Sequence, residues 1–226
     1  MIFSNKDVVC SNIVFNISLI SQVTKTTFLG VIIDNKLSWR HHCQKIHMSI
    51  SRTLGILRRV RNMLPREALF SIYNALILPQ LQYGILAWGN SSQLNLNKLL
   101  VVQKKSLRVI NRSDYRAHAL PLFVKYNTLP LHDLYQYELG VFMFKNNMNL
   151  LSPLLLSLFT KNSEIHHYDT RSSKKLHFYR ARTSKFLSTV RHQGPILWNK
   201  LSPVPPFKSI YRFKRYLKKR LLTHSI

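Results

Sequence analysis

The hydrophobic residues of this chain change their spacing near Trp39, and this change constrains the fold more than any other feature. Before it, β-branched and aromatic residues occur in short runs such as Phe28–Ile33, a pattern typical of short strands. After it, apolar residues recur at helical spacing, beginning with Ile46, Ile50 and Leu54. The sequence therefore predicts a mainly helical α+β fold. A short N-terminal antiparallel β-hairpin should be followed by a helical bundle and a basic C-terminal region.

Prolines and capping residues divide the first helical part into three segments. The first runs from about Trp39 to Leu64. Pro65 suits the first turn of a second helix, with Glu67 near its positive end. Pro79 should break that second helix, and Ser91–Ser92 can cap a third.

A polar joint over residues 111–116 separates these helices from further helical runs at 120–126 and 131–148. Residues 160–185 are polar and basic, so we expect loops with short extended pieces there. The chain should end in a basic helix that begins near Ile210. Trp88 and Trp198 are expected to fill the core, because large aromatic residues at structural junctions usually pack.

The charge of the chain is strongly unbalanced: Lys and Arg number 34, Asp and Glu only 8, and the formal net charge is +26. A chain this basic attracts polyanions, so nucleic acid is the default partner. The apolar fraction of 46% is enough for a core, and we therefore expect a folded cationic surface rather than a disordered tail. No apolar stretch approaches the ~20 residues that cross a bilayer, so no membrane partner is expected.

The carboxylates are few and scattered. Two-metal phosphoryl transfer needs clustered carboxylates, so the sequence predicts neither catalytic residues nor metal ligands in this chain. His41, His42, Cys43 and His47 include one helical i, i+4 pair, but structural zinc takes four ligands, and solvent-facing or capping roles are expected instead. Cys10 and Cys43 do not make a disulfide framework, which indicates reduced intracellular thiols.

Short motifs occur along nearly the whole chain in a definite order. They are Met1–Ser4, Phe28–Asp34 with Leu37–Trp39, Pro79–Gly84 with Trp88, His118–Phe123, Leu129–Leu134, Tyr137–Gly140, His166–Arg171, Gly194–Asn199 and Phe213–Leu222. Together they resemble the downstream part of reverse transcriptases from non-LTR (LINE-type, jockey-like) retrotransposons.

The resemblance implies a palm edge with a primer-grip-like motif in residues 1–38, a helical thumb in 39–112 and a C-terminal region in 113–226. It implies that Phe28, Leu29 and Gly30 hold the primer terminus; a buried strand end before a turn is an equal alternative. The family's fingers and catalytic palm strands would precede Met1, and no Asp-Asp pair occurs here. The chain therefore resembles a truncated polymerase, inactive alone, whose full family enzyme copies RNA into DNA with Mg²⁺.

The candidate nucleic-acid contacts are basic residues on two helices and one loop. Opposing acids are too scarce to neutralise them, and arginine binds phosphate in a forked geometry; an ordinary solvated face is the alternative. The loop also carries aromatic residues that can stack bases or instead pack into the core. The candidates are Arg52, Arg58, Arg59 and Arg61 on the first helix, Lys104, Lys105 and Arg108 on the third, and Lys174, Lys175, Arg180 and Arg182 in the loop.

These observations predict an intracellular chain, nuclear or cytoplasmic, that binds RNA and DNA and associates with the missing palm and fingers. Two alternatives stay open. One is a non-enzymatic basic RNA- or DNA-binding module unrelated to polymerases, which would not need a β-hairpin packed on a helical bundle. The other is an unstable pseudogene-like product, because a palm edge without its partner strands invites aggregation. A helix-turn-helix protein is disfavoured, since no short turn precedes a separate recognition helix.

Overall fold

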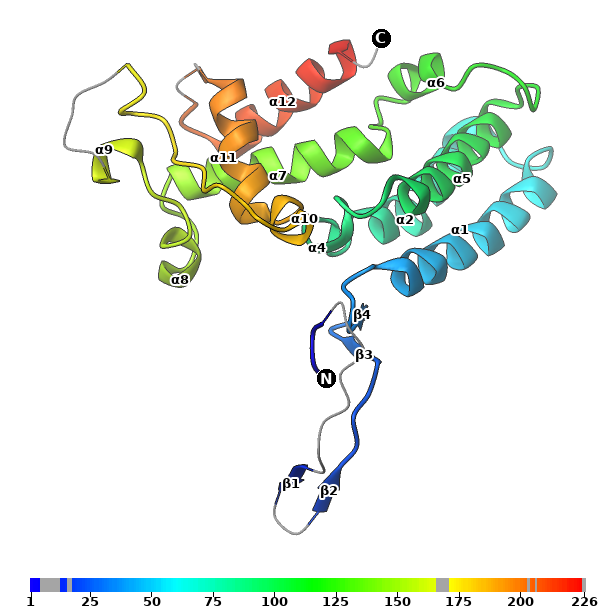
Figure 1. The fold of residues 1–226 in the computed structure, drawn as a ribbon. Coiled ribbons are helices and arrows are strands. Elements are labelled where there is room, and N and C mark those ends of the chain that lie inside the picture. The colour runs from blue at the N-terminus through cyan, green and yellow to red at the C-terminus, as the bar shows by residue number, and fades with distance from the viewer. Residues whose placement is uncertain (5–12, 16–17, 166–170, 203, 206, 225–226) are drawn as a thin grey trace.

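The N-terminal part of the protein forms two β-hairpins that project from a helical body (Figure 1). The computed structural model describes residues 1–4, 13–15, 18–165, 171–202, 204–205 and 207–224. Strands β1 (Ile13–Phe15) and β2 (Ser18–Ile20) pair antiparallel, as do β3 (Lys25–Phe28) and β4 (Val31–Asp34). The predicted mainly helical α+β fold, with an antiparallel hairpin before the helices, is confirmed.

Helices make up most of the rest of the described chain. They are α1 (Arg40–Val60), α2 (Arg66–Leu76), α3 (Leu78–Gln82), α4 (Ile85–Trp88), α5 (Gln93–Asn111), α6 (Leu120–Lys125), α7 (Leu131–Asn147), α8 (Pro153–Leu156), α9 (Asn162–Ile165), α10 (Ser184–Leu187), α11 (Val190–Leu201) and α12 (Ile210–His224). Among the described residues, no helix is both long and apolar enough to cross a membrane.

Helices α1, α2 and α5 pack together at one end of the body, with α1 running along α5 (Figure 1). The apolar stripe of α1 points into this core, where Ile50 and Leu57 are fully buried. The predicted first helix was too long, because α1 ends at Val60. The chain turns there, and the Arg112 guanidinium donates to the carbonyl oxygens of Arg61 (3.1 Å) and Leu64 (3.0 Å).

Helix α7 is the centre of the second group, which contains α11 and α12. A Cβ atom on Gly140 would lie 2.6 Å from a Leu217 methyl, so the glycine lets α12 approach α7 closely. The Phe144 and Phe213 rings stack with centroids 4.3 Å apart. Trp198 is buried beside Phe213, and Trp88 is fully buried at α4, so both tryptophans fill the core as predicted.

The other expected boundaries are close to the observed ones. Pro65 is the N-cap of α2 rather than a residue of its first turn, and Pro79 lies in the first turn of α3, just after α2 ends. Ser92 is the N-cap of α5, but its side chain makes no capping hydrogen bond. Between residues 160 and 185, the described part contains one β-bridge, Lys161 to Leu176, and short helical turns. The expected motif at 166–171 lies mostly outside the described residues.

Candidate nucleic-acid interface

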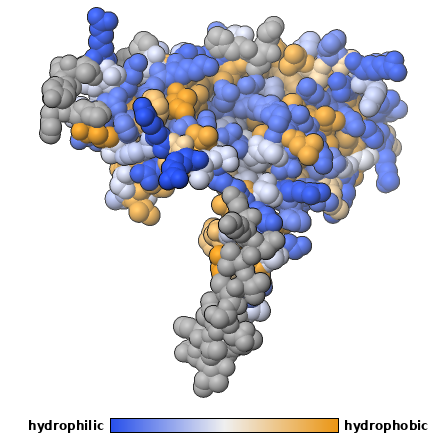
Figure 2. Space-filling view, viewed as in Figure 1, coloured by the Kyte–Doolittle hydropathy of each residue, from blue (hydrophilic) through white to orange (hydrophobic). Residues whose placement is uncertain are grey.

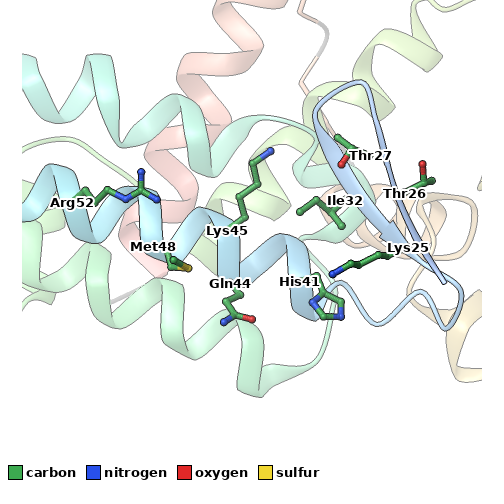
Figure 3. Close-up of a pocket in the computed structure, with 9 residues that line it drawn as sticks. All are labelled: Lys25, Thr26, Thr27, Ile32, His41, Gln44, Lys45, Met48 and Arg52. Atoms are coloured by element: carbon green, nitrogen blue, oxygen red, sulfur yellow. The ribbon is translucent and has the colours of Figure 1, made fainter. Parts of the chain in front are cut away.

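A hollow of about 470 Å³ lies between the β3–β4 hairpin and α1 (Figure 3). Strand β3 contributes Lys25, and α1 contributes His41, Lys45 and Arg52. In Figure 3, the Lys25 side chain extends from the hairpin toward His41. Among the residues that the structure describes, no Asp or Glu lines this hollow, so its cations attract an anion without competition from a described carboxylate.

The cations of the hollow continue along one face of α1. The exposed residues of this face follow the helical spacing of three and four positions, and they are His41, Lys45, Met48, Arg52, Ile56 and Arg59. We call the basic members of this face, together with Lys25, the α1 surface. Figure 2 shows hydrophilic residues over most of the visible helical body, with apolar patches between them.

Two further hollows extend this basic region around the start of α1. The hollow between α1 and α5 contains Arg40, His47 and Lys98, and it shares Met48 with the first hollow. A third, of about 820 Å³, again contains Arg40 and Lys98 and reaches Lys185 at α10. None of the three has a carboxylate among its described lining residues. The result is a continuous cationic region that starts at the hairpin.

The turn of the β3–β4 hairpin lies beside this region and is held from two sides. Leu29 and Gly30 both have positive φ values, +46° and +79°, as a tight type I′ hairpin turn requires. The Tyr83 hydroxyl donates to the Leu29 carbonyl oxygen at 2.6 Å, and Lys45 Nζ lies 3.5 Å from the Gly30 carbonyl oxygen. Phe28 and Leu29 are 63% and 73% exposed. The turn is therefore anchored through its backbone and offers its side chains to a partner.

Asp34 fixes the start of α1 relative to the hairpin. Its carboxylate accepts hydrogen bonds from the backbone N–H groups of Ser38 (3.0 Å) and Trp39 (3.1 Å). Burial alone would raise the pKa of Asp34, but these hydrogen bonds outweigh burial and leave the pKa below its ordinary value. Asp34 is the last residue of β4, and its carbonyl oxygen accepts the Leu37 N–H at 2.9 Å, so Asp34 begins the turn that leads to α1.

His42 joins β4 to the helical core. Its Nδ1 atom accepts a hydrogen bond from the Ile32 backbone N–H at 3.3 Å. Its ring packs against the Trp88 ring in a T-shaped arrangement, with the two ring centroids 5.8 Å apart. Because Nδ1 accepts, Nε2 carries the proton, and Nε2 has no hydrogen-bond partner in the described part of the chain. Burial, and next the positive charge of Lys45, lower the pKa of His42.

This environment predicts that acid weakens the fold. The folded protein disfavours the charged imidazole, so unfolding takes up a proton. The stability contributed by neutral His42 is complete above the ordinary histidine pKa of about 6.5 and is lost as pH falls below that value. In thermal melts from pH 7.5 to 5.5, we expect His42→Leu to show a smaller loss of Tm than the unsubstituted chain. The control His118→Leu, at an exposed site, should lose as much Tm as the unsubstituted chain. If His42→Leu also lost as much, the acid sensitivity would not come from His42.

The structure distributes the predicted basic residues over several faces. Arg52 lines the hollow, and Arg58, Arg59 and Arg61 are exposed toward the far end of α1. Lys105 lies over the Tyr115 ring (5.9 Å), and Arg108 donates through Nε to the Ala117 carbonyl oxygen (2.7 Å), which gives Arg108 a role within the fold. Lys104 faces a different groove, between α5, α7, α11 and α12. Lys174, Lys175, Arg180 and Arg182 are exposed on the segment that follows residue 170.

That segment is partly packed. Tyr179 bonds through its hydroxyl to Thr160 (3.2 Å) and has Arg191 over its ring at 4.8 Å, while Phe178 is 55% exposed. Of the adjacent aromatic residues Phe178 and Tyr179, only Phe178 is largely open to solvent and free to stack on a base. The sequence reasoning missed Lys25 and Lys45. A usable signal existed for Lys45, since it lies seven positions before Arg52 and therefore shares its helix face.

The carboxylates in the described part of the chain do not fit a catalytic metal pair. In the part of the chain that the structure describes, no three His, Cys, Asp or Glu side chains come together in a way that could hold a metal ion. Glu138 has a partner within the fold, because its carboxylate accepts a hydrogen bond from the Gln82 side chain at 3.2 Å. Cys43 is buried near the Ser91 hydroxyl. We therefore derive no reaction step through Mg²⁺ from these residues.

The fold and this region define a basic helical protein with a β-hairpin arm. Its sequence is similar to the RNA-directed DNA polymerase from mobile element jockey of Drosophila funebris, with 32% identity over 116 residues. The Drosophila melanogaster jockey polymerase is 28% identical over 116 residues, and the probable RNA-directed DNA polymerase from transposon BS is 25% identical over 101 residues. No family model and no solved structure matches the chain.

About half of this chain is therefore a region related to the RNA-directed DNA polymerases of jockey-like non-LTR elements, and the resemblance drawn from the motifs is confirmed. The matched segment covers 50% of the chain and 13% of either jockey polymerase. The chain thus spans only a small part of the length of these relatives.

Proposed function

We propose that this chain binds RNA and DNA through the α1 surface, as the thumb-side portion of a jockey-like reverse transcriptase. The observation that carries the proposal is the hollow in which Lys25, Lys45 and Arg52 lie beside the exposed Phe28–Gly30 turn, with no carboxylate among the described residues that line it. Closely spaced cations without neighbouring acids bind a phosphate backbone. Such contacts position the strand and carry little base identity.

The attachment of the hairpin to the helices supports the polymerase assignment over an unrelated basic module. Tyr83, in the motif Pro79–Gly84, donates to Leu29, in the motif Phe28–Asp34. The two motifs that resemble the primer grip and the thumb are therefore in direct contact. A primer-grip role for Phe28, Leu29 and Gly30 agrees with this position, because the turn is exposed and adjoins the basic region.

A salt titration tests the binding. Fluorescence anisotropy should detect binding of labelled single-stranded RNA, single-stranded DNA and an RNA–DNA hybrid at low ionic strength. The logarithm of the affinity should fall linearly with the logarithm of the salt concentration, by ~0.7 to 0.9 per phosphate neutralised. A flat salt response, or no binding at low salt, would contradict the proposal.

We also propose that these 226 residues alone do not polymerise nucleotides. The support is the spacing of the carboxylates and the lack of a metal-binding cluster among the described ones; two-metal nucleotidyl transfer requires such a cluster. The Mg²⁺ of the family reaction would then be held by residues that this chain does not contain. A primer-extension assay with Mg²⁺ and deoxynucleotides should show no product, and template-dependent incorporation would refute the proposal.

The hairpin also suggests how the chain associates with the rest of a polymerase. All four residues of β3 are exposed, and a two-stranded hairpin is only marginally stable by itself. We propose that β3 adds to the palm sheet of the polymerase, with Phe28 and Leu29 packing against it. Co-purification with the palm and fingers of a jockey-like polymerase should be lost in Leu29→Asp and kept in Leu94→Asp, which changes an equally exposed leucine on α5.

A further inference from the structure

A second concave surface lies on the helical body at α5, α7, α11 and α12, and it differs in chemistry from the α1 surface. Its volume is about 730 Å³. The floor consists of Leu201, Leu217 and Leu221, and the walls include Leu100, Leu120 and Leu197. We call this surface the leucine groove. Its position between packed helices is typical of preformed binding sites.

The rim of the leucine groove is basic. Its described lining includes three cations, Lys104, Lys200 and Arg220, and one carboxylate, Asp133. Arg220 is held in place, because its Nη1 atom donates to the Tyr216 hydroxyl at 3.1 Å and lies 3.4 Å from the Leu201 carbonyl oxygen. The groove therefore combines an apolar floor with a fixed and predominantly positive edge.

We propose that the leucine groove docks an amphipathic helix of an acidic protein partner. Its apolar side chains, at positions i, i+3, i+4 and i+7, would enter the groove, as in other helix-in-groove complexes. Acidic residues beside them would meet Lys104, Lys200 and Arg220. This inference does not depend on nucleic-acid binding by the α1 surface.

The lining disfavours two other occupants. Single-stranded nucleic acid is held by stacking on aromatic side chains, and the described residues that line the leucine groove include no Phe, Tyr or Trp. A second copy of this chain would bring a formal charge of +26 against a basic rim, and like charges at an interface oppose association. An acidic partner with apolar anchors matches both the floor and the rim.

A designed peptide tests this surface on the full chain. The probe is a fluorescent helical peptide with Leu at the four anchor positions and Glu on its flanks. We expect it to bind at moderate salt, and we expect Leu120→Gln and Lys200→Glu each to weaken binding at least about 10-fold. Leu120 is 46% exposed and Lys200 is exposed, so both variants should fold, which circular dichroism checks.

The controls separate docking from general charge attraction. A peptide with Gln in place of the four Leu should bind much more weakly, and Lys208→Glu, at an exposed site outside the groove, should bind the Leu peptide as the unsubstituted chain does. Leu120→Gln should leave RNA affinity unchanged. The proposal would be overturned if the two peptides bound equally, or if Leu120→Gln and Lys200→Glu both bound the Leu peptide fully. It would also be overturned if single-stranded RNA displaced the peptide from the Lys45→Glu variant, in which a cation of the α1 surface is reversed.

Discussion

Reversing three cations of the α1 surface, with Lys45→Glu, Arg52→Glu and Arg59→Glu together, should weaken binding of single-stranded RNA by about 100-fold at physiological salt. These residues share one exposed face of α1, and the hollow that contains the first two has no carboxylate in the described part of its lining. If each contacts one phosphate, the log–log salt dependence should also become shallower by ~2. Fluorescence anisotropy measured across a salt series gives both quantities.

The matched control changes net charge by the same amount elsewhere. Lys208→Glu, Arg212→Glu and Lys219→Glu reverse three exposed cations at and just before α12. If the α1 surface is the binding site, this variant should lose only a few-fold in affinity and keep most of its salt dependence. Equal losses in the two triple variants would show that RNA responds to total charge alone and would remove the argument for a defined site.

Replacing Trp88 by alanine should cost about 3–5 kcal/mol of unfolding free energy, the range for a large aromatic residue in a core. The Trp88 side chain is fully buried, packs against His42 in a T-shaped ring contact, and donates through Nε1 to the Tyr83 carbonyl oxygen at 2.9 Å. The change would therefore loosen both the helical core and the attachment of the hairpin. Urea unfolding followed by circular dichroism measures the effect.

Met63→Ala is the control for this change, because Met63 is 82% exposed; its unfolding free energy should stay within about 0.5 kcal/mol of the original. The same experiment addresses the unstable pseudogene-like alternative. A single cooperative transition in the unsubstituted chain supports a specifically packed core. A broad, non-cooperative loss of signal, unaffected by Trp88→Ala, would favour the unstable product.

Much of the fold could be predicted from the sequence because it depends on local patterns. The stripe of Ile46, Ile50 and Leu54 predicted the buried face of α1, and Pro79 predicted the break after α2. The errors occurred at the ends of helices. The sequence predicted a first helix that runs to Leu64, whereas α1 ends at Val60. Just past that end, the carbonyl oxygens of Arg61 and Leu64 accept hydrogen bonds from Arg112, which is 48 residues beyond Leu64 along the chain, and helical periodicity contains no information about such a distant donor.

The candidate site was only partly predictable for the same reason. The sequence predicted nucleic-acid binding and included among its candidates Arg52 and Arg59, which lie on the α1 surface. The sequence also grouped these two arginines with Arg108 and Lys104. In the structure, Arg108 donates a hydrogen bond to the Ala117 carbonyl oxygen, and Lys104 faces the leucine groove. Basic residues on separate helices are equivalent until packing decides which faces of those helices are exposed together.

The sequence by itself determined the class of structure and the character of the surface: short strands before Trp39, amphipathic helices after it, and an excess of cations with no local carboxylate cluster. These follow from composition and from hydrophobic spacing within single elements. Only the tertiary structure decided that Tyr83 holds a turn 54 residues away, that Lys25 joins Lys45 and Arg52, and that leucines from separate helices form one groove. Such contacts are set by the packing of whole helices and strands against one another, which no local pattern specifies.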